Sequence, residues 1–129
     1  MMDRILAELE LVRSQYPSLE FREEDFWARI SAYPVPADWG VEDPELAFQV
    51  PRDLFGQEPY GFWVRPMLRL PGGGIPSNTS PEPVSTGFGE GWQQFSWAPD
   101  GWKPGSDPLK GTNLLDFVRS FGRRLGELN

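Results

Sequence analysis

Cysteine and histidine are both absent from this chain of 129 residues. These residue types provide the most reactive protein nucleophile, the usual general base at neutral pH and the usual zinc ligands, so most enzyme classes lose their simplest mechanism. A chain without cysteine has no disulfide framework, which fits an intracellular protein. The segment before Tyr16 is too charged for a signal peptide, and no apolar run approaches the roughly 20 residues of a membrane span. We therefore expect a cytoplasmic protein that holds no metal ion or other cofactor and has no membrane partner.

Basic side chains are also scarce, with 12 lysines and arginines against 19 aspartates and glutamates, and a formal charge of −7. Binding to a phosphate backbone depends on clustered Lys and Arg, so we expect no nucleic acid as a partner. The densest acidic cluster is formed by Glu23, Glu24 and Asp25. Adjacent like charges are typical of a solvated turn, and a metal or acid–base role is the alternative interpretation.

Two segments have the apolar spacing of amphipathic helices. Near the start of the chain, Ile5, Leu9 and Val12 recur at intervals of three and four residues. Near the end, apolar residues recur in the same way from Leu114 to Leu125, and Asn113 is placed to cap the first turn. The sequence therefore predicts one helix at each end of the chain.

Between these helices, the residues favour strands and then turns. Strand formers dominate 26–33, apolar and other residues alternate over 46–50, and a third apolar stretch at 60–70 is interrupted by Pro66, which indicates an edge or bent strand. From Pro71 to Gly111 the chain holds seven of its fourteen prolines and nine of its fourteen glycines, which excludes a long helix there.

The length is that of one domain, which we place at residues 1–129. The order of elements predicts the α+β class, with an N-terminal helix, an antiparallel sheet of about four strands, a long Pro/Gly-rich loop and a C-terminal helix packed on the sheet.

Two sequence segments resemble a known family. In GWKPGSDPLKGTNLLDFVRSFGRRL, Trp102 and Pro104 stand like a Trp-x-Pro motif that is followed by a helix. In LAFQVPRDLFGQEPYGFWV, a strand, fragments of a proline loop and a second strand follow one another. Both segments resemble the ubiquitin-conjugating enzymes, and with PSNTS and GWQQFSWAPDGWKPGSD the pattern is most similar to the divergent prokaryotic branch. That resemblance implies activating enzymes, ubiquitin-like proteins and JAB-type peptidases as pathway neighbours, and an anchoring role for Trp102, buried against the last helix.

The chain departs from this family at the reacting position. The family's thioester cysteine falls about eight residues before the Trp-x-Pro tryptophan, which is Gln94 here, and the family's His-Pro-Asn triplet has no counterpart beyond Asn78. A thioester on this chain is therefore chemically impossible. One reading is a non-catalytic adaptor that binds a ubiquitin-like protein, its adenylating activating enzyme, or both.

The second reading is a carrier that holds the modifier as an oxyester on a hydroxyl. Ser96 lies nearest the missing cysteine, and Asn78 would stabilise the oxyanion. A serine needs a base, which without histidine would be Asp100, Glu90 or a lysine. Other hydroxyls in the loop are those of Ser77, Thr79, Ser80, Ser85 and Thr86.

The third reading is an RWD-like structural interaction module with no link to ubiquitin-like proteins. In the family reading, the first helix contacts the activating enzyme. Arg4, Glu8 and Arg13, on the polar side of that helix, are the binding residues that we expect there.

Overall fold

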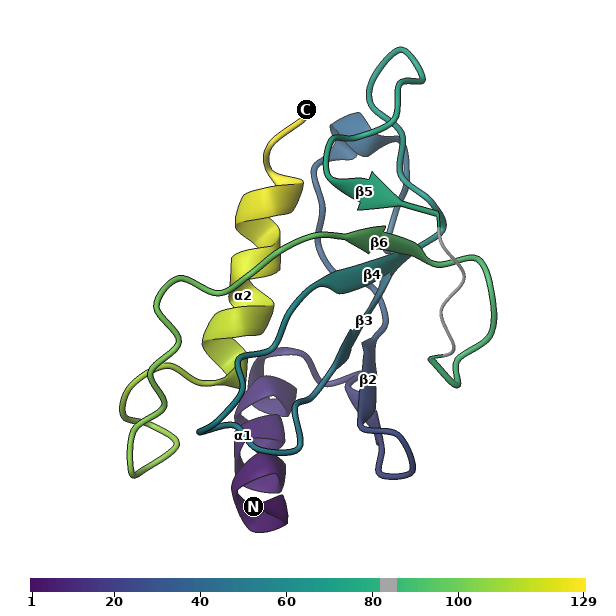
Figure 1. Cartoon of the computed structure of the whole chain (residues 1–129). Coiled ribbons are helices and arrows are strands. Elements are labelled where there is room, and N and C mark those ends of the chain that lie inside the picture. Colours follow the sequence, from purple (N-terminus) through teal and green to yellow (C-terminus); the bar gives the residue numbers. More distant parts are fainter. Residues whose placement is uncertain (82–85) are drawn as a thin grey trace.

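The computed structural model describes residues 1–81 and 86–129 as two helices packed on one antiparallel sheet (Figure 1). In chain order the elements are α1 (Met2–Gln15), β1 (Glu20–Arg22), β2 (Trp27–Ile30), the short 3-10 helix η1 (Ala37–Trp39), β3 (Glu45–Gln49), β4 (Phe62–Arg65), β5 (Thr79–Ser80), β6 (Gln93–Phe95) and α2 (Leu114–Leu125). The strand order is β1-β2-β3-β4-β6-β5. Figure 1 shows α1 and α2 on the same side of this sheet.

The predicted α+β class and the two terminal helices are confirmed, but the sheet has six strands rather than about four. The additional strands are short, since β1 has three residues and β5 two. Of the two alternatives for the stretch at 60–70, an edge or a bent strand, the edge strand is wrong, because β4 lies between β3 and β6. Pro66 directly follows β4, so its missing N–H removes no hydrogen bond from the interior of the ladder.

The main core lies between the helices and the sheet. Asn113 caps α2 by accepting a hydrogen bond from the Asp116 N–H at 2.9 Å, and the Asp116 carboxylate accepts one from the Asn113 N–H in return. The ring of Phe121 then stacks on Phe62 of β4 at 4.4 Å and meets Phe48 of β3 edge-on at 6.0 Å. Each fully buried phenylalanine of this kind contributes about 1.5 to 3 kcal/mol.

The opposite face of the sheet has an aromatic cluster of its own. Trp27 and Trp92 are buried there, with Trp63 and Phe88 packed against them. The guanidinium of Arg65 lies 4.4 Å from the centre of a Trp92 ring and donates to the carbonyl oxygens of residues 88 and 90. The chain leading into β6 is therefore fastened onto the outer face of the sheet.

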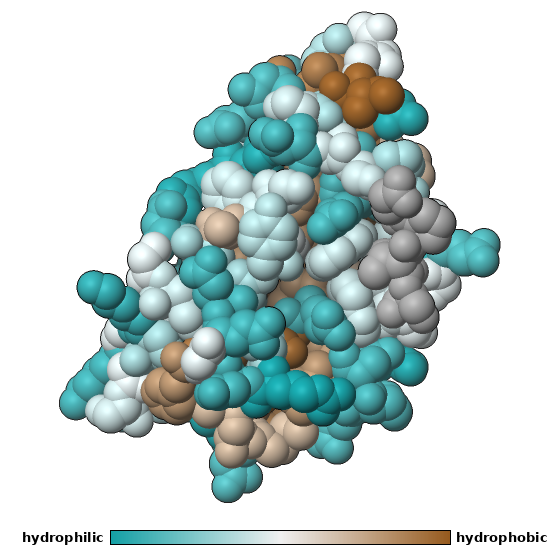
Figure 2. All heavy atoms as spheres, viewed as in Figure 1, coloured by the Kyte–Doolittle hydropathy of each residue, from teal (hydrophilic) through white to brown (hydrophobic). Residues whose placement is uncertain are grey.

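Most of the surface seen in Figure 2 is hydrophilic. A strongly apolar spot lies at its upper end, where Figure 1 draws the connection between β4 and β5. Ile75, a residue of that connection, is 68% exposed. Among residues 1–81 and 86–129, none of the helices combines the length and apolar character needed to cross a membrane.

Candidate functional site

Asn78 and Ser96 are neighbours in the structure. Asn78 directly precedes β5 and Ser96 directly follows β6, and the Ser96 N–H donates to the Asn78 carbonyl oxygen at 2.9 Å. This hydrogen bond extends the β5–β6 register by one residue beyond the pairing of Thr79 with Phe95. Both residues are exposed, and Asn78 has a left-handed backbone (φ 57°), which asparagine tolerates better than most residues. The two residues that we assigned to acyl chemistry therefore share one surface site.

The Ser96 hydroxyl is accessible but has no activating base within the described ranges. Across 1–81 and 86–129, Ser96 makes no side-chain hydrogen bond. The Asp100 carboxylate is instead paired with Arg123 at 2.9 Å, and Glu90 lies before β6, at the other end of the strand from Ser96. A serine without a base is a weak nucleophile, so this site suits only an acyl group that is already activated.

Gln94 occupies the position where the resembled family has cysteine. It lies within β6, paired with Trp63 of β4 on one side and with Ser80 of β5 on the other, and its side chain is partly exposed. Ser96 is two residues further along the chain, so both positions lie on one side of the extended backbone.

Three of the other candidate hydroxyls are less suited to carrying a modifier. The Ser77 hydroxyl donates to the Asn129 carbonyl oxygen at 3.1 Å, and the Thr79 hydroxyl donates to the Pro76 carbonyl oxygen at 2.8 Å. The expectation that Thr86 is an available hydroxyl is wrong, because Thr86 is fully buried and its oxygen accepts the Phe88 N–H. Ser80 lies in β5, and Ser85 lies outside the described residues.

A buried arginine that was not among the predicted site residues holds the chain next to Asn78. Arg124 is only 4% exposed, and its Nη2 donates to the carbonyl oxygens of Ser77 at 2.8 Å and of Asn129 at 3.1 Å. Burial lowers the pKa of the Arg124 guanidinium, and the nearby Glu127 carboxylate opposes this shift. Arg124 therefore connects α2 to the segment that presents Asn78.

The expectation that Arg4 and Glu8 lie on an exposed binding face of α1 is wrong. Glu8 is fully buried, and its carboxylate accepts hydrogen bonds from Arg4 Nε at 2.5 Å and from the Leu114 N–H at 2.7 Å. Arg4 Nη1 donates to the Gly105 carbonyl oxygen at 2.8 Å, and its guanidinium lies 5.0 Å from the centre of the Phe55 ring. Arg4 and Glu8 thus join α1 to the first turn of α2 and to the segment around Gly105.

Among the three expected binding residues of α1, Arg13 alone keeps a substantially exposed side chain, at 38%. It forms an ion pair with Glu10 one turn away and lines a hollow on the outer side of the helix. Of these three residues, only Arg13 therefore remains well exposed for a contact with a partner.

We expected Trp102 to be substantially buried as an anchor. It does pack against the core, but its side chain is only partly buried. The indole packs against the main core, and its Nε1 donates to the Leu54 carbonyl oxygen at 2.8 Å. Trp102 therefore fastens the connection between β6 and α2 to the connection between β3 and β4.

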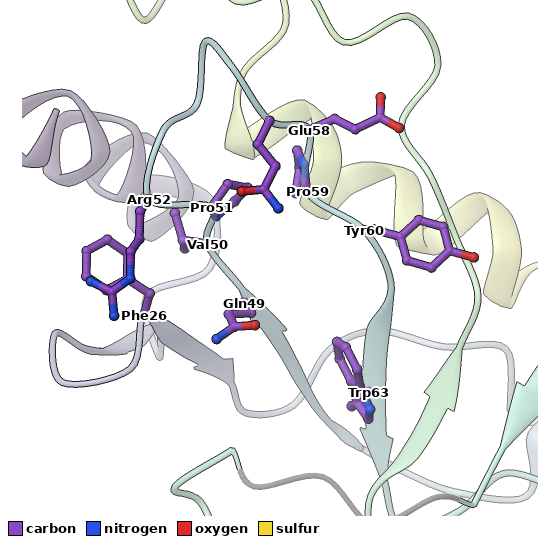
Figure 3. A pocket seen from close by; sticks show the side chains of 10 residues that line it. Phe26, Gln49, Val50, Pro51, Arg52, Glu58, Pro59, Tyr60 and Trp63 are labelled. Atoms are coloured by element: carbon purple, nitrogen blue, oxygen red, sulfur yellow. The ribbon is translucent and has the colours of Figure 1, made fainter.

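A second hollow, of about 310 Å³, lies where the connection between β3 and β4 leaves the sheet (Figure 3). Its walls are held in place, since Arg52 lies over the Phe26 ring at 4.1 Å and Gln49 Nε2 donates to the Asp25 carbonyl oxygen at 3.0 Å. Gln49 of β3 and Trp63 of the neighbouring strand β4 both line it. The hollow offers aromatic and amide contacts rather than a reactive group.

The acidic turn after β1 shows no sign of a metal site. Within 1–81 and 86–129, no three Asp, Glu, His or Cys side chains are gathered closely enough to hold a metal ion. Asp25 is paired with Arg22 at 3.3 Å, while Glu23 and Glu24 are exposed.

Comparison of the chain with protein-family models, with curated proteins and with solved structures finds no match in any of the three. The family suggested by the motifs therefore stays a resemblance.

Proposed function

We propose that this chain is a ubiquitin-conjugating-enzyme-like protein of a prokaryotic modification pathway. It binds a ubiquitin-like protein, the adenylating enzyme that activates it, or both, and forms no thioester because it has no cysteine. The observation that carries the proposal is the pairing of Asn78 with Ser96 beside β6, the strand that holds Gln94. The antiparallel sheet with a helix at each end of the chain supports the same reading.

Binding is the property to test first. We expect the chain to co-elute in size-exclusion chromatography with a ubiquitin-like protein, or with an adenylating enzyme, from the same organism. Titration calorimetry with each protein alone would then identify which one it contacts. Failure to bind either protein would contradict the proposal and favour the RWD-like module.

A second function, that of an oxyester carrier, is favoured by the exposed position of Ser96, whose hydroxyl makes no hydrogen bond to residues 1–81 or 86–129. In this reaction the Ser96 oxygen attacks the carbonyl carbon of a C-terminal acyl adenylate. The bond between the Ser96 oxygen and the acyl carbon forms as the bond between the acyl carbon and the phosphate oxygen breaks. AMP leaves, and the hydroxyl proton passes to water. An amide donor such as that of Asn78 would stabilise the oxyanion.

Intact mass spectrometry after incubation with the ubiquitin-like protein, the activating enzyme and ATP separates carrier from adaptor. An oxyester gives a mass gain that survives thiol reductants and is lost in hydroxylamine, whereas an isopeptide bond to Lys103 or Lys110 survives both. Ser96→Ala should abolish the labile adduct, and Ser106→Ala, a change at another exposed serine, should leave it intact. Binding without any mass gain would leave the adaptor alone.

A further inference from the structure

The outer side of α1 and the turn after β1 enclose a groove of about 430 Å³, which we call the α1 groove. It is formed by residues from two segments that are separate in the sequence. Its apolar lining comes from Leu6, Leu9 and Phe21, and its charged lining from Glu10, Arg13, Glu23 and Glu24.

The floor of the α1 groove offers apolar surface that the fold leaves uncovered. Leu6 is 40% exposed, although its neighbour Leu9 is buried in the core. Phe21 is half-buried and is held in place by an edge-on contact with Phe26, with ring centres 5.7 Å apart. Covering such a surface with an aliphatic side chain would release free energy roughly in proportion to the area buried.

The rim of the α1 groove is acidic. Its single guanidinium, that of Arg13, is already paired with Glu10. Glu23 has no ion pair within the described ranges, and Glu24 forms a long, solvent-exposed ion pair with Arg22 at 3.8 Å. Two exposed carboxylates, one of them without an ion pair in the described part of the chain, thus lie beside the apolar floor of a chain whose formal charge is −7. This combination complements a ligand that is both cationic and aliphatic.

We propose that the α1 groove is the docking site for a basic amphipathic helix of a partner protein. Leu6, Glu10 and Arg13 are four and three residues apart, so the groove follows the axis of α1 and suits a second helix laid along it. An aliphatic side chain of that helix contacts Leu6 and Phe21, while its Lys or Arg side chains face Glu23 and Glu24. The inference rests on the proposed function for the identity of the partner, and it adds the chemistry of the docking segment.

The test uses a synthetic amphipathic helix of leucine and lysine, with a leucine–glutamate helix of the same pattern as its counterpart. Fluorescence anisotropy should show that the full chain binds the lysine peptide and not the glutamate peptide. Replacing Glu23 and Glu24 by lysine should weaken binding roughly tenfold. Replacing Glu42 and Asp43, an exposed acidic pair in another loop, by lysine changes the net charge equally and should have little effect.

The apolar part of the site has its own matched pair. Leu6→Ser should weaken binding of the lysine peptide by about five- to tenfold, whereas Ile75→Ser, at a more exposed position in a distant turn, should not. No binding of the lysine peptide, or equal weakening by the two acidic-pair variants, would overturn the proposal. A chain that binds the peptide in the α1 groove but neither pathway protein would retain the groove and lose the proposed function.

Discussion

The helix α1 carries two glutamate–arginine pairs, one on each side. The pair on the inner side fastens the fold, whereas the pair on the outer side remains in contact with water. Glu8 is fully buried, with Arg4 and the Leu114 N–H as its partners. Glu10 pairs with Arg13, but these side chains stay 69% and 38% exposed. Loss of one partner from a buried pair leaves a desolvated charge behind, while an exposed pair is solvated whether or not it forms. Burial, rather than residue type, therefore separates the structural side of α1 from the side open to partners.

The largest effect is expected from Glu8→Ala. This change leaves the mostly buried Arg4 without its carboxylate and the Leu114 N–H without its hydrogen-bond acceptor, so the free energy of unfolding should fall by about 3 to 5 kcal/mol. Glu10→Ala, two residues away on the outer side, should cost less than about 1 kcal/mol. Urea denaturation of both variants measures the difference. Similar losses for the two would break the contrast between the sides of α1.

Trp102→Ala tests another contact that fastens the inner region. The change removes a partly buried indole and its hydrogen bond to the Leu54 carbonyl oxygen, and it should cost about 2 to 3 kcal/mol. Phe55→Ala is a suitable control, because Phe55 is 53% exposed and its loss should cost about 1 kcal/mol or less. A melting temperature unchanged by Trp102→Ala would show that the indole anchors nothing.

The smallest effect is a dependence on alkaline pH. Burial, with a further contribution from Tyr16, raises the pKa of Tyr33, whose hydroxyl donates to the Val118 carbonyl oxygen at 2.7 Å. Below about pH 10, tyrosine is protonated in both states and the stability from Tyr33 is fully present. Above that pH the unfolded chain loses this proton first, so stability should fall by up to about 1.4 kcal/mol per pH unit.

Denaturation series between neutral and alkaline pH would measure this slope in three proteins. Tyr33→Phe should flatten the alkaline decline, although it also loses the hydrogen bond to Val118. Tyr60→Phe, at a residue that is 53% exposed, should keep the decline of the unmodified chain. Equal slopes in all three proteins would remove Tyr33 as the cause.

Much of the fold could be predicted because periodicity reports which face of an element is buried. Regular spacing identified both helices and β3, and the Asn113 cap was correctly placed. The strands β1 and β5 have three and two residues, which is too short for an alternating pattern to emerge. β6 lies among prolines and glycines that indicate turns, so its pairing with β4 is a long-range contact that local sequence does not report.

The buried charges of the site were missed although the sequence contained a signal for them. Glu8 lies three residues after Ile5 and four before Val12, so it occupies the apolar stripe of α1. Arg124 lies three residues after Phe121 and occupies the corresponding stripe of α2. A charged residue on an apolar stripe is typical of a buried hydrogen-bond network. The adjacency of Asn78 and Ser96, by contrast, depends on the β5–β6 pairing and has no local signal.

Native mass spectrometry of the chain mixed with a ubiquitin-like protein and an adenylating enzyme of its own organism would show whether the chain binds these proteins. We expect a complex in which at least one of these proteins is bound, formed equally well in the presence of a thiol reductant because no thioester is involved. A spectrum that shows only the separate components, at concentrations well above those of typical cellular complexes, would contradict this expectation.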